Sequence, residues 1–184
     1  MRICDLIRVD PLFLRLTWRE GRLESIGLGW SGIQVAGAGT SALDAPGDPL
    51  ESVMATAWGK PFQESLERYL AKEDPAWPEV PLAGEGLSDF AWEVLRRLRV
   101  LPAGTWLSYG RLAAVCGYPK AARAVGRVMA RNPWPLLIPC HRVLGRSGHL
   151  TGFGPGLDLK QYLLAHEGIP YAPVYASGNR RVTK

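Results

Sequence analysis

Apolar and polar residues alternate, imperfectly, along two neighbouring segments near the start of the chain. The first segment runs from Leu12 to Thr17 and the second from Leu23 to Trp30, and the polar run Arg19 to Arg22 lies between them. A period of two on either side of a short polar turn is typical of an antiparallel β-hairpin. The pattern therefore predicts a small antiparallel sheet in the N-terminal part.

Three later segments have the spacing of an amphipathic helix. One follows Pro61, where Phe62, Leu66, Tyr69 and Leu70 share a face. A second covers residues 90–98, with Ser88 as its N-cap and a group of arginines at its C-terminal end, where the helix dipole favours cations. A third covers Leu159 to His166.

Two short helices around a glycine are predicted between residues 108 and 131. Residues 108–116 form the first, Gly117-Tyr118-Pro119 the turn, and residues 120–131 the second, which suggests a helix-turn-helix. Arg123, Arg127 and Arg131 fall at i, i+4 and i+8 and form one basic stripe, opposite an apolar face. Such a helix suits a DNA groove, although an ordinary amphipathic helix with a solvated arginine edge has the same pattern.

Prolines and glycines between Pro75 and Gly86 mark a linker, and the sign of the charge changes at the same place. We therefore expect an α/β protein with three parts. Residues 1–85 form a small domain with an antiparallel sheet and a helix, residues 86–170 a mainly helical domain with the helix-turn-helix, and residues 171–184 a tail. We expect the end of the chain, from Ile169, to be partly ordered at best.

The net charge of +5 hides a strong asymmetry. Residues 1–93 carry 15 acidic and 8 basic residues, whereas residues 94–157 carry 10 basic residues and no carboxylate. A one-signed field of this size suits a polyanion, and nucleic acid is favoured over a membrane because the stretch has no continuous lipid-binding helix. A merely solvated basic face is the alternative.

Composition also limits the compartment. Three cysteines, Cys4, Cys116 and Cys140, are too few and too scattered for a disulfide framework, and no apolar run approaches the ~20 residues that cross a bilayer. No signal peptide is apparent at the N-terminus. We expect a cytoplasmic protein whose thiols stay reduced.

The segment Leu136 to Val143 carries the main candidate chemistry. An apolar run ends at Pro139 and is followed by Cys140 and His141. A neighbouring histidine and nearby cations favour the thiolate, the nucleophilic form of cysteine. A single Cys-His pair is weak evidence, so the surrounding motifs decide how it is interpreted. Cys116 is expected to be a small core residue, and Cys4 has no partners for a metal site.

Five motifs together resemble the O6-alkylguanine-DNA alkyltransferase family in order and spacing. They are Ser108-Tyr109-Gly110, Ala122-Arg123-Ala124-Val125-Gly126, Asn132-Pro133, Pro139-Cys140-His141-Arg142-Val143, and Leu163-Leu164-Ala165-His166-Glu167-Gly168. The resemblance covers roughly residues 87–168. It implies repair of O6-alkylguanine in double-stranded DNA: binding in the minor groove, rotation of the damaged base into a pocket, and one irreversible alkyl transfer to Cys140. It implies a monomer, no cofactor and no metal, and it leaves O4-alkylthymine open as a substrate.

The resemblance also assigns roles to residues. Cys140 is the nucleophile, His141 accepts its proton through a water, Glu167 orients the imidazole, and Tyr109 donates a hydrogen bond to the N3 edge of the base. Taken alone, Glu167 could be a solvated surface carboxylate and Tyr109 a core aromatic residue.

Two further sets of residues follow from the same resemblance. The expected DNA-binding residues are Tyr109, Ala121, Ala122, Arg123, Ala124, Gly126 and Arg127, with Arg123 entering the base stack in place of the rotated nucleotide. The expected pocket residues are Met129, Asn132, Val143, Phe153, Gly154 and Pro155. Asn132 precedes a proline and is also a common turn residue. Pro155 stands where the family often has glycine, and it predicts a stiffer pocket loop.

Three other functions are compatible with parts of the pattern. They are a non-catalytic damage sensor, against which Cys140 argues, a transcription factor that reads the major groove, and a cysteine hydrolase. The hydrolase is the weakest of these because no oxyanion-hole signature accompanies Cys140.

Overall fold

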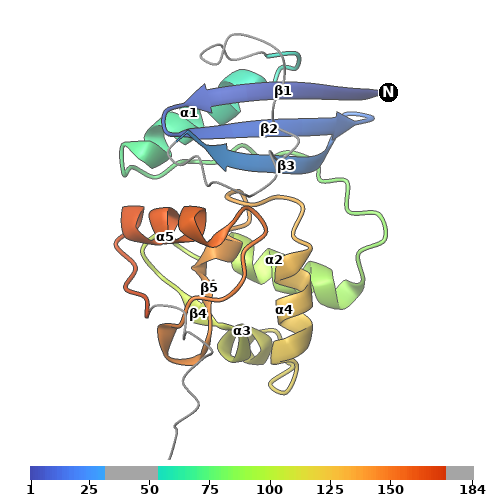
Figure 1. Cartoon of the computed structure of the whole chain (residues 1–184). Helices are drawn as coiled ribbons and strands as arrows, with labels where there is room; N and C mark the ends of the chain where they lie inside the picture. Colours follow the sequence, from blue (N-terminus) through green and yellow to red (C-terminus); the bar gives the residue numbers. More distant parts are fainter. Residues whose placement is uncertain (32–53, 173–184) are drawn as a thin grey trace, which may run out of the picture.

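The structure, a computed structural model, describes residues 1–31 and 54–172. An antiparallel sheet opens the chain, in the order β1 (Arg2–Val9), β2 (Leu12–Arg19) and β3 (Arg22–Trp30), and α1 (Gly59–Leu70) packs on it (Figure 1). The hairpin and the helix after Pro61 are confirmed. The first strand was not predicted.

Asp5 explains why the pattern of apolar and polar residues does not predict β1. Its side chain is fully buried and accepts hydrogen bonds from Trp18 Nε1 at 2.7 Å, from the Ala55 and Thr56 amides at 2.6 and 2.8 Å, and from the Thr56 hydroxyl at 2.7 Å. A buried carboxylate is tolerated only when it is paired in this way. Asp5 therefore attaches the segment before α1 to the sheet. In the sequence, an aspartate at this position would be taken for a solvent-exposed residue.

The C-terminal part is mainly helical and lies beneath the sheet (Figure 1). The order is α2 (Asp89–Arg99), β4 (Leu107–Ser108), α3 (Tyr109–Val115), α4 (Ala122–Ala130), a 3₁₀ turn (Cys140–Arg142), β5 (Val143–Leu144), a second short turn (Arg146–Gly148) and α5 (Leu157–His166). The helix-turn-helix and the other predicted helices are confirmed, and the hydroxyl of Ser88 caps α2 by accepting from the Ala91 amide.

Buried residues from both parts belong to one continuous hydrophobic cluster. The indole of Trp134, fully buried, donates to Leu23 O at 2.9 Å across 111 residues of sequence, and the Ile26 amide donates to Pro133 O at 2.7 Å. The chain between α1 and α2 is also attached to the sheet, because Leu23 exchanges backbone hydrogen bonds with Pro81 and Ala83. The boundary near residue 85 stays a prediction.

The structure describes only the first four residues, 169–172, of the end that was expected to be partly ordered. Ile169 is 2% exposed and packs with Leu144, Leu150 and Leu164, and Ala172 forms a bridge to His149. These apolar contacts hold residues 169–172 on the helical part. The rest of the expected tail, residues 173–184, lies outside the described residues.

Across the described ranges, none of the helices has the length and apolar character that crossing a membrane requires.

Candidate active site

Cys140 begins a 3₁₀ turn that its neighbours hold in place. Asn132 accepts from the Trp134 amide at 3.1 Å and donates to Ile138 O at 2.9 Å, so it closes the loop that leads to the cysteine. Leu136 within that loop is buried and has a left-handed backbone (φ 72°), a conformation that costs energy for a leucine. The packing of the loop therefore sets the position of the thiol.

Cys140 is largely buried. The residue is 6% exposed, and burial raises the pKa of the thiol above its ordinary value, although a hydrogen bond from Asn132 and the charge of Lys160 act in the opposite direction. The sequence suggested that nearby cations favour a thiolate. The structure corrects this for the resting protein, because loss of hydration outweighs their effect.

Lys160 is a cation whose charge lowers the pKa of the Cys140 thiol, and sequence analysis did not identify it. It comes from α5, its residue is fully buried, and Nζ donates to Val143 O at 2.8 Å and to Thr151 O at 3.4 Å. Burial lowers the pKa of Lys160 to about 8, while the charge of Cys140 acts in the opposite direction. Its ammonium group therefore stabilises negative charge on the sulfur once a thiolate forms.

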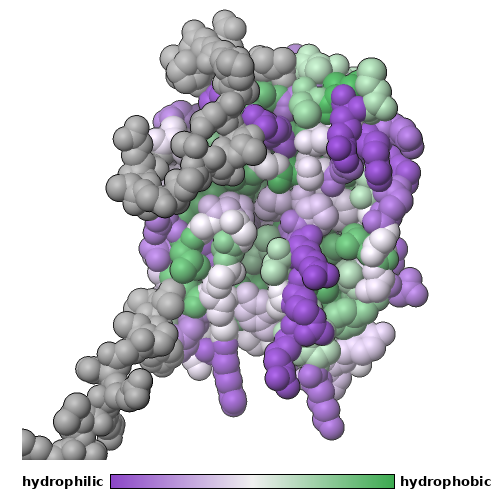
Figure 2. Space-filling model, turned by 45° about the vertical axis from the view of Figure 1, so that its right-hand side comes forward, coloured by the Kyte–Doolittle hydropathy of each residue, from purple (hydrophilic) through white to green (hydrophobic). Residues whose placement is uncertain are grey.

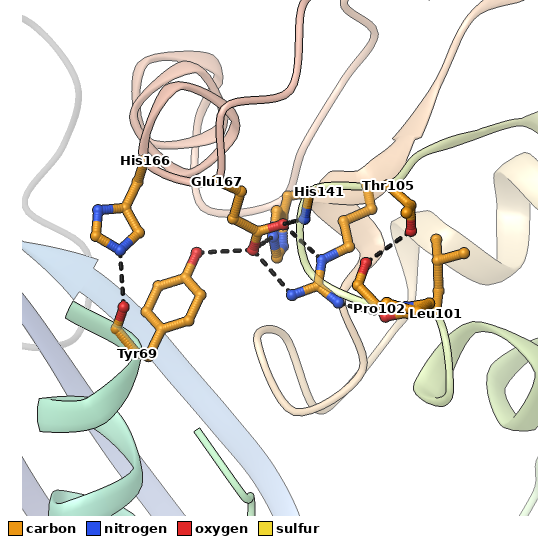
Figure 3. A network of polar contacts seen from close by, with 9 residues as sticks. Tyr69, Leu101, Pro102, Thr105, His141, His166 and Glu167 are labelled. Atoms are coloured by element: carbon orange, nitrogen blue, oxygen red, sulfur yellow. Dashed lines mark hydrogen bonds and ion pairs between the residues drawn. The ribbon is translucent and has the colours of Figure 1, made fainter. Parts of the chain in front are cut away.

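Four buried side chains meet behind the cysteine turn, and we call them the carboxylate cluster: Tyr69, His141, Arg142 and Glu167 (Figure 3). Glu167 Oε1 lies 2.7 Å from His141 Nε2, 2.9 Å from Arg142 Nη2 and 2.9 Å from the Tyr69 hydroxyl. Its Oε2 accepts from Arg142 Nε at 2.7 Å. The Glu167 side chain is 2% exposed, so the alternative of a solvated surface carboxylate is wrong.

These contacts determine the state of the imidazole. A carboxylate oxygen only accepts, so His141 Nε2 carries the hydrogen and Nδ1 carries the lone pair. Nδ1 is buried and has no hydrogen-bond partner among the described residues. Burial lowers the pKa of His141, against the effect of Glu167, and favours the neutral ring. A neutral ring with a free lone pair beside Cys140 is able to accept a proton.

Glu167 stays ionised in this setting. Burial alone would raise the pKa of its carboxyl group, but the hydrogen bonds and charges of His141 and Arg142 outweigh burial and lower the pKa to about 2. Arg142 is also anchored by a hydrogen bond to Leu101 O. The buried charges of Glu167 and Arg142 thus compensate each other.

Tyr109 lies on the other side of the cysteine turn. The parallel pairing of Leu107 with Val143 and of Ser108 with Leu144 brings the start of α3 beside this turn. The Tyr109 hydroxyl shares a 2.7 Å hydrogen bond with Thr151 Oγ1, and burial raises the pKa of the phenol. Tyr109 therefore has a partner at rest and has to exchange it before it binds anything else. The predicted pocket residues Met129 and Val143 are buried members of the core.

Apart from Tyr109 at the start of α3, the expected DNA-binding residues lie together on α4 and at its N-terminus. Arg123, Arg127 and Arg131 are exposed, Val125 and Met129 are buried, and Ala121, Ala122, Ala124 and Gly126 are half-buried. Gly126 faces the ring of Tyr109, because a Cβ there would lie 3.9 Å from it. Figure 2 shows a column of hydrophilic side chains on the lower part of the molecule, with less polar surface on both sides. The separation of a basic and an apolar face is confirmed.

The loop 152–156 faces the N-terminal sheet. Gly154 and Pro155 line a cavity of about 450 Å³ together with Asn132, Pro133, Pro135 and residues of β2 and β3. The ring of Phe153 packs against the core, 6.0 Å from Lys160 Nζ. The predicted pocket residues Asn132, Gly154 and Pro155 are thus brought together.

Replacing Pro155 with glycine is expected to change the ratio of reaction rates with O6-benzylguanine and O6-methylguanine. Proline fixes φ and removes an N–H, so glycine loosens the loop that the family resemblance assigns to the substrate pocket and changes its tolerance for a bulky group. We expect a change of about fivefold or more in this ratio, since one pocket contact is worth about 1 kcal/mol or more. Equal ratios in the two proteins would contradict a role of Pro155 in selectivity.

Sequence analysis missed three residues of the site: Tyr69, Arg142 and Lys160. Arg142 lies inside the motif that carries Cys140, and this position could have identified it as a residue of the site. In the sequence, Lys160 resembles a solvated helix residue and Tyr69 resembles a core helix residue. Only the fold brings them to the site. Within the described residues, no group of three or more His, Cys, Asp or Glu side chains could hold a metal ion.

The fold and the site together define a helix-turn-helix protein with a thiol beside a neutral, carboxylate-bound histidine. Comparison with known proteins agrees with this class. Residues 89–169 match the family model of the 6-O-methylguanine DNA methyltransferase DNA-binding domain. The human methylated-DNA–protein-cysteine methyltransferase is 40% identical over 160 residues, which cover 80% of this chain and 76% of that protein. The chain therefore belongs to the methylated-DNA–protein-cysteine methyltransferase family.

Two other relatives extend the comparison. The enzyme of that name from Methanosarcina acetivorans is 46% identical over 103 residues, which cover 56% of this chain and 65%, less than two thirds, of that protein. A crystal structure of Mycobacterium tuberculosis OGT in complex with DNA superimposes with a TM-score of 0.65 at 30% identity, and the match covers 90% of this chain and 92% of that one. The fold is thus shared over nearly the full length.

Proposed function

We propose that the protein repairs double-stranded DNA by moving the alkyl group of O6-alkylguanine to Cys140, once per molecule. The observation that carries the proposal is the geometry at His141, whose Nε2 is bound to Glu167 at 2.7 Å while its buried Nδ1 stays available beside the cysteine. The family supports the same activity. A thiol that is to attack carbon needs a base of this kind, because burial keeps it protonated at rest.

The reaction balances without a cofactor. The Cys140 thiol gives its proton to His141 Nδ1, by way of a water in the relay that the family resemblance implies. The sulfur then forms a bond to the alkyl carbon while the bond from that carbon to O6 breaks. The electron pair of the broken bond stays on the guanine, which takes up a proton. Glu167 stabilises the imidazolium, and Lys160 stabilises the thiolate.

The leaving group is a guanine anion and needs a hydrogen-bond donor as it forms. Tyr109 is the donor in this proposal, aimed at the N3 edge of the base. Its hydroxyl first has to leave Thr151, to which it is bound at 2.7 Å. A donor that gains its partner in the transition state accelerates the chemical step.

DNA binds along α4 in this proposal. The exposed arginines supply charge for phosphates, and the small residues let the helix approach the minor groove closely. Little base-sequence preference is expected, because the minor groove shows a degenerate pattern. The protein acts as a monomer. Its cysteines in the described residues are unpaired, which supports a reducing compartment, the cytoplasm.

Mass spectrometry tests the function directly. The protein is incubated with an excess of duplex that contains O6-methylguanine, and the tryptic peptide with Cys140 is analysed. One methyl group on Cys140, and an unmodified guanine in the DNA, are the expected results. Specific binding with no methylation would favour a transcription factor or a damage sensor, and thioester hydrolysis by Cys140 would favour a hydrolase.

Replacing Arg123 with alanine is expected to slow repair in duplex DNA by about tenfold or more, because extruding a base costs a few kcal/mol of unstacking and the inserted arginine offsets part of it. The rate with the free base O6-benzylguanine should stay the same. Single-turnover rates on both substrates measure this. Arg131→Ala is the matched control, since it removes one charge from the same face of α4. Equal losses on both substrates would contradict the insertion role of Arg123.

A further inference from the structure

The last turn of α1, in the N-terminal part, contacts the carboxylate cluster directly. Tyr69 is 3% exposed, and its hydroxyl donates to Glu167 Oε1 at 2.9 Å, across 98 residues of sequence (Figure 3). Burial, and then the charge of Glu167, raise the pKa of the phenol far above its usual range, so it remains a donor at every physiological pH. This contact is the one hydrogen bond in the described structure that an N-terminal side chain makes to Glu167.

A second contact fixes the same turn. The imidazole of His166, next to Glu167, bonds to the backbone oxygen of Tyr69 at 2.8 Å, and the rings of His166 and Tyr69 lie 4.9 Å apart. Two consecutive residues at the end of α5 therefore hold the side chain and the main chain of Tyr69.

We propose that Tyr69 is a positioning residue for the reaction at Cys140: through its hydroxyl, α1 holds the Glu167 carboxylate in the orientation that directs His141. This rests on the proposed function. Tyr69 and His141 share the same carboxylate oxygen, so the phenol also takes part of the negative charge that would otherwise act on the imidazole. The N-terminal part thereby lowers the basicity of His141 and does more than support the fold.

The direction of the effect follows from the groups around His141. Glu167 faces it from the end of α5, Lys160 acts on it from within α5, and Arg142 acts on it from the cysteine turn. Glu167 alone stabilises the imidazolium. Without the phenol, Oε1 carries more charge toward His141, and the pKa of His141 rises. Because the neutral ring accepts the proton, the acidic limb of the rate profile moves to higher pH.

Tyr69→Phe removes the hydroxyl and keeps the ring, and the readout is the pH profile of the single-turnover rate. We expect the acidic limb to move up by about half a unit, less than the full effect of one hydrogen bond to a charged group, because the phenol acts on His141 only through the shared carboxylate. The plateau should fall by about threefold to tenfold as Glu167 loses a partner. Tyr162→Phe is the matched control, because Tyr162 stacks on His166 in the same region and is expected to leave both quantities unchanged.

Two outcomes would overturn the proposal. One is a Tyr69→Phe profile identical to that of the wild type. The other is a lower plateau with an unmoved limb, which a merely loosened core would produce. If the wild-type protein transfers no alkyl group, the proposed function fails, and titration of the His141 ring by NMR still decides the role of Tyr69. Equal His141 pKa values in the wild type and in Tyr69→Phe would then overturn it.

Discussion

A Cys140→Ala variant is expected to bind duplex DNA that contains O6-methylguanine and to transfer no methyl group. Binding should stay within about twofold of the wild type, because affinity for DNA comes mainly from phosphate contacts of Lys and Arg, which the substitution leaves in place. Transfer should be lost completely, since no other described cysteine lies beside a histidine and a buried lysine. Fluorescence anisotropy measures the binding, and intact-protein mass spectrometry measures the transfer.

Cys4→Ala is the control, because Cys4 is exposed on β1 and contacts Thr17 only weakly, at 3.9 Å. This variant should take up one methyl group at the wild-type rate. Methylation that persists in Cys140→Ala, or that disappears in Cys4→Ala, would show that Cys140 is not the acceptor.

Glu167→Gln is expected to lower the free energy of unfolding by about 3–5 kcal/mol, because it leaves the charge of Arg142 buried without its partner. The side chains of Arg142 and Glu167 are 7% and 2% exposed, so water screens neither of them. Urea unfolding at pH 7 measures the loss. The double variant Glu167→Gln/Arg142→Met should recover much of it, because both charges are then absent. A single variant within about 1 kcal/mol of the wild type would contradict this account.

The same carboxylate predicts how stability depends on pH. Its pKa is lowered from 4.5 to about 2 in the folded protein, so its contribution is complete above about pH 4.5 and is lost as the pH falls toward 2. His141 acts in the same direction from a higher pH, because its pKa is lowered by burial and the folded state resists protonation. The acid loss should be smaller in Glu167→Gln, measured as the urea midpoint at each pH.

The sequence predicted well where local spacing carries the information. The hairpin, the helix after Ser88 and the two helices around Gly117 each depend on neighbours within a few residues, and all are confirmed. The pairing of His141 with Glu167 was also correctly anticipated, from the family motif. In contrast, β1 was missed because Asp5, buried among hydrogen-bond donors, interrupts its apolar pattern.

The residues of the site that sequence analysis missed are brought there by contacts between distant segments of the chain. Lys160 stands between Leu159 and Gln161 and resembles a solvated helix residue, but its ammonium group donates to the carbonyl oxygens of Val143 in β5 and of Thr151. Tyr69 meets Glu167 only because α1 and α5 pack together. The rise in the pKa of the Cys140 thiol was not anticipated, for a related reason. Charge is visible in a sequence, whereas the loss of hydration depends on how the whole fold covers the thiol.

The hydrogen bond from Trp134 to Leu23 has a practical consequence for anyone who wishes to shorten the protein. A fragment that begins near residue 86 would keep the cysteine, the histidine and the arginine helix, yet it would lack Leu23, whose carbonyl oxygen accepts from the indole of Trp134, the largest fully buried side chain in the described residues. A fragment that begins near residue 86 is therefore expected to be less stable than the full chain. A fusion partner is better joined to the full chain than exchanged for its first eighty-five residues.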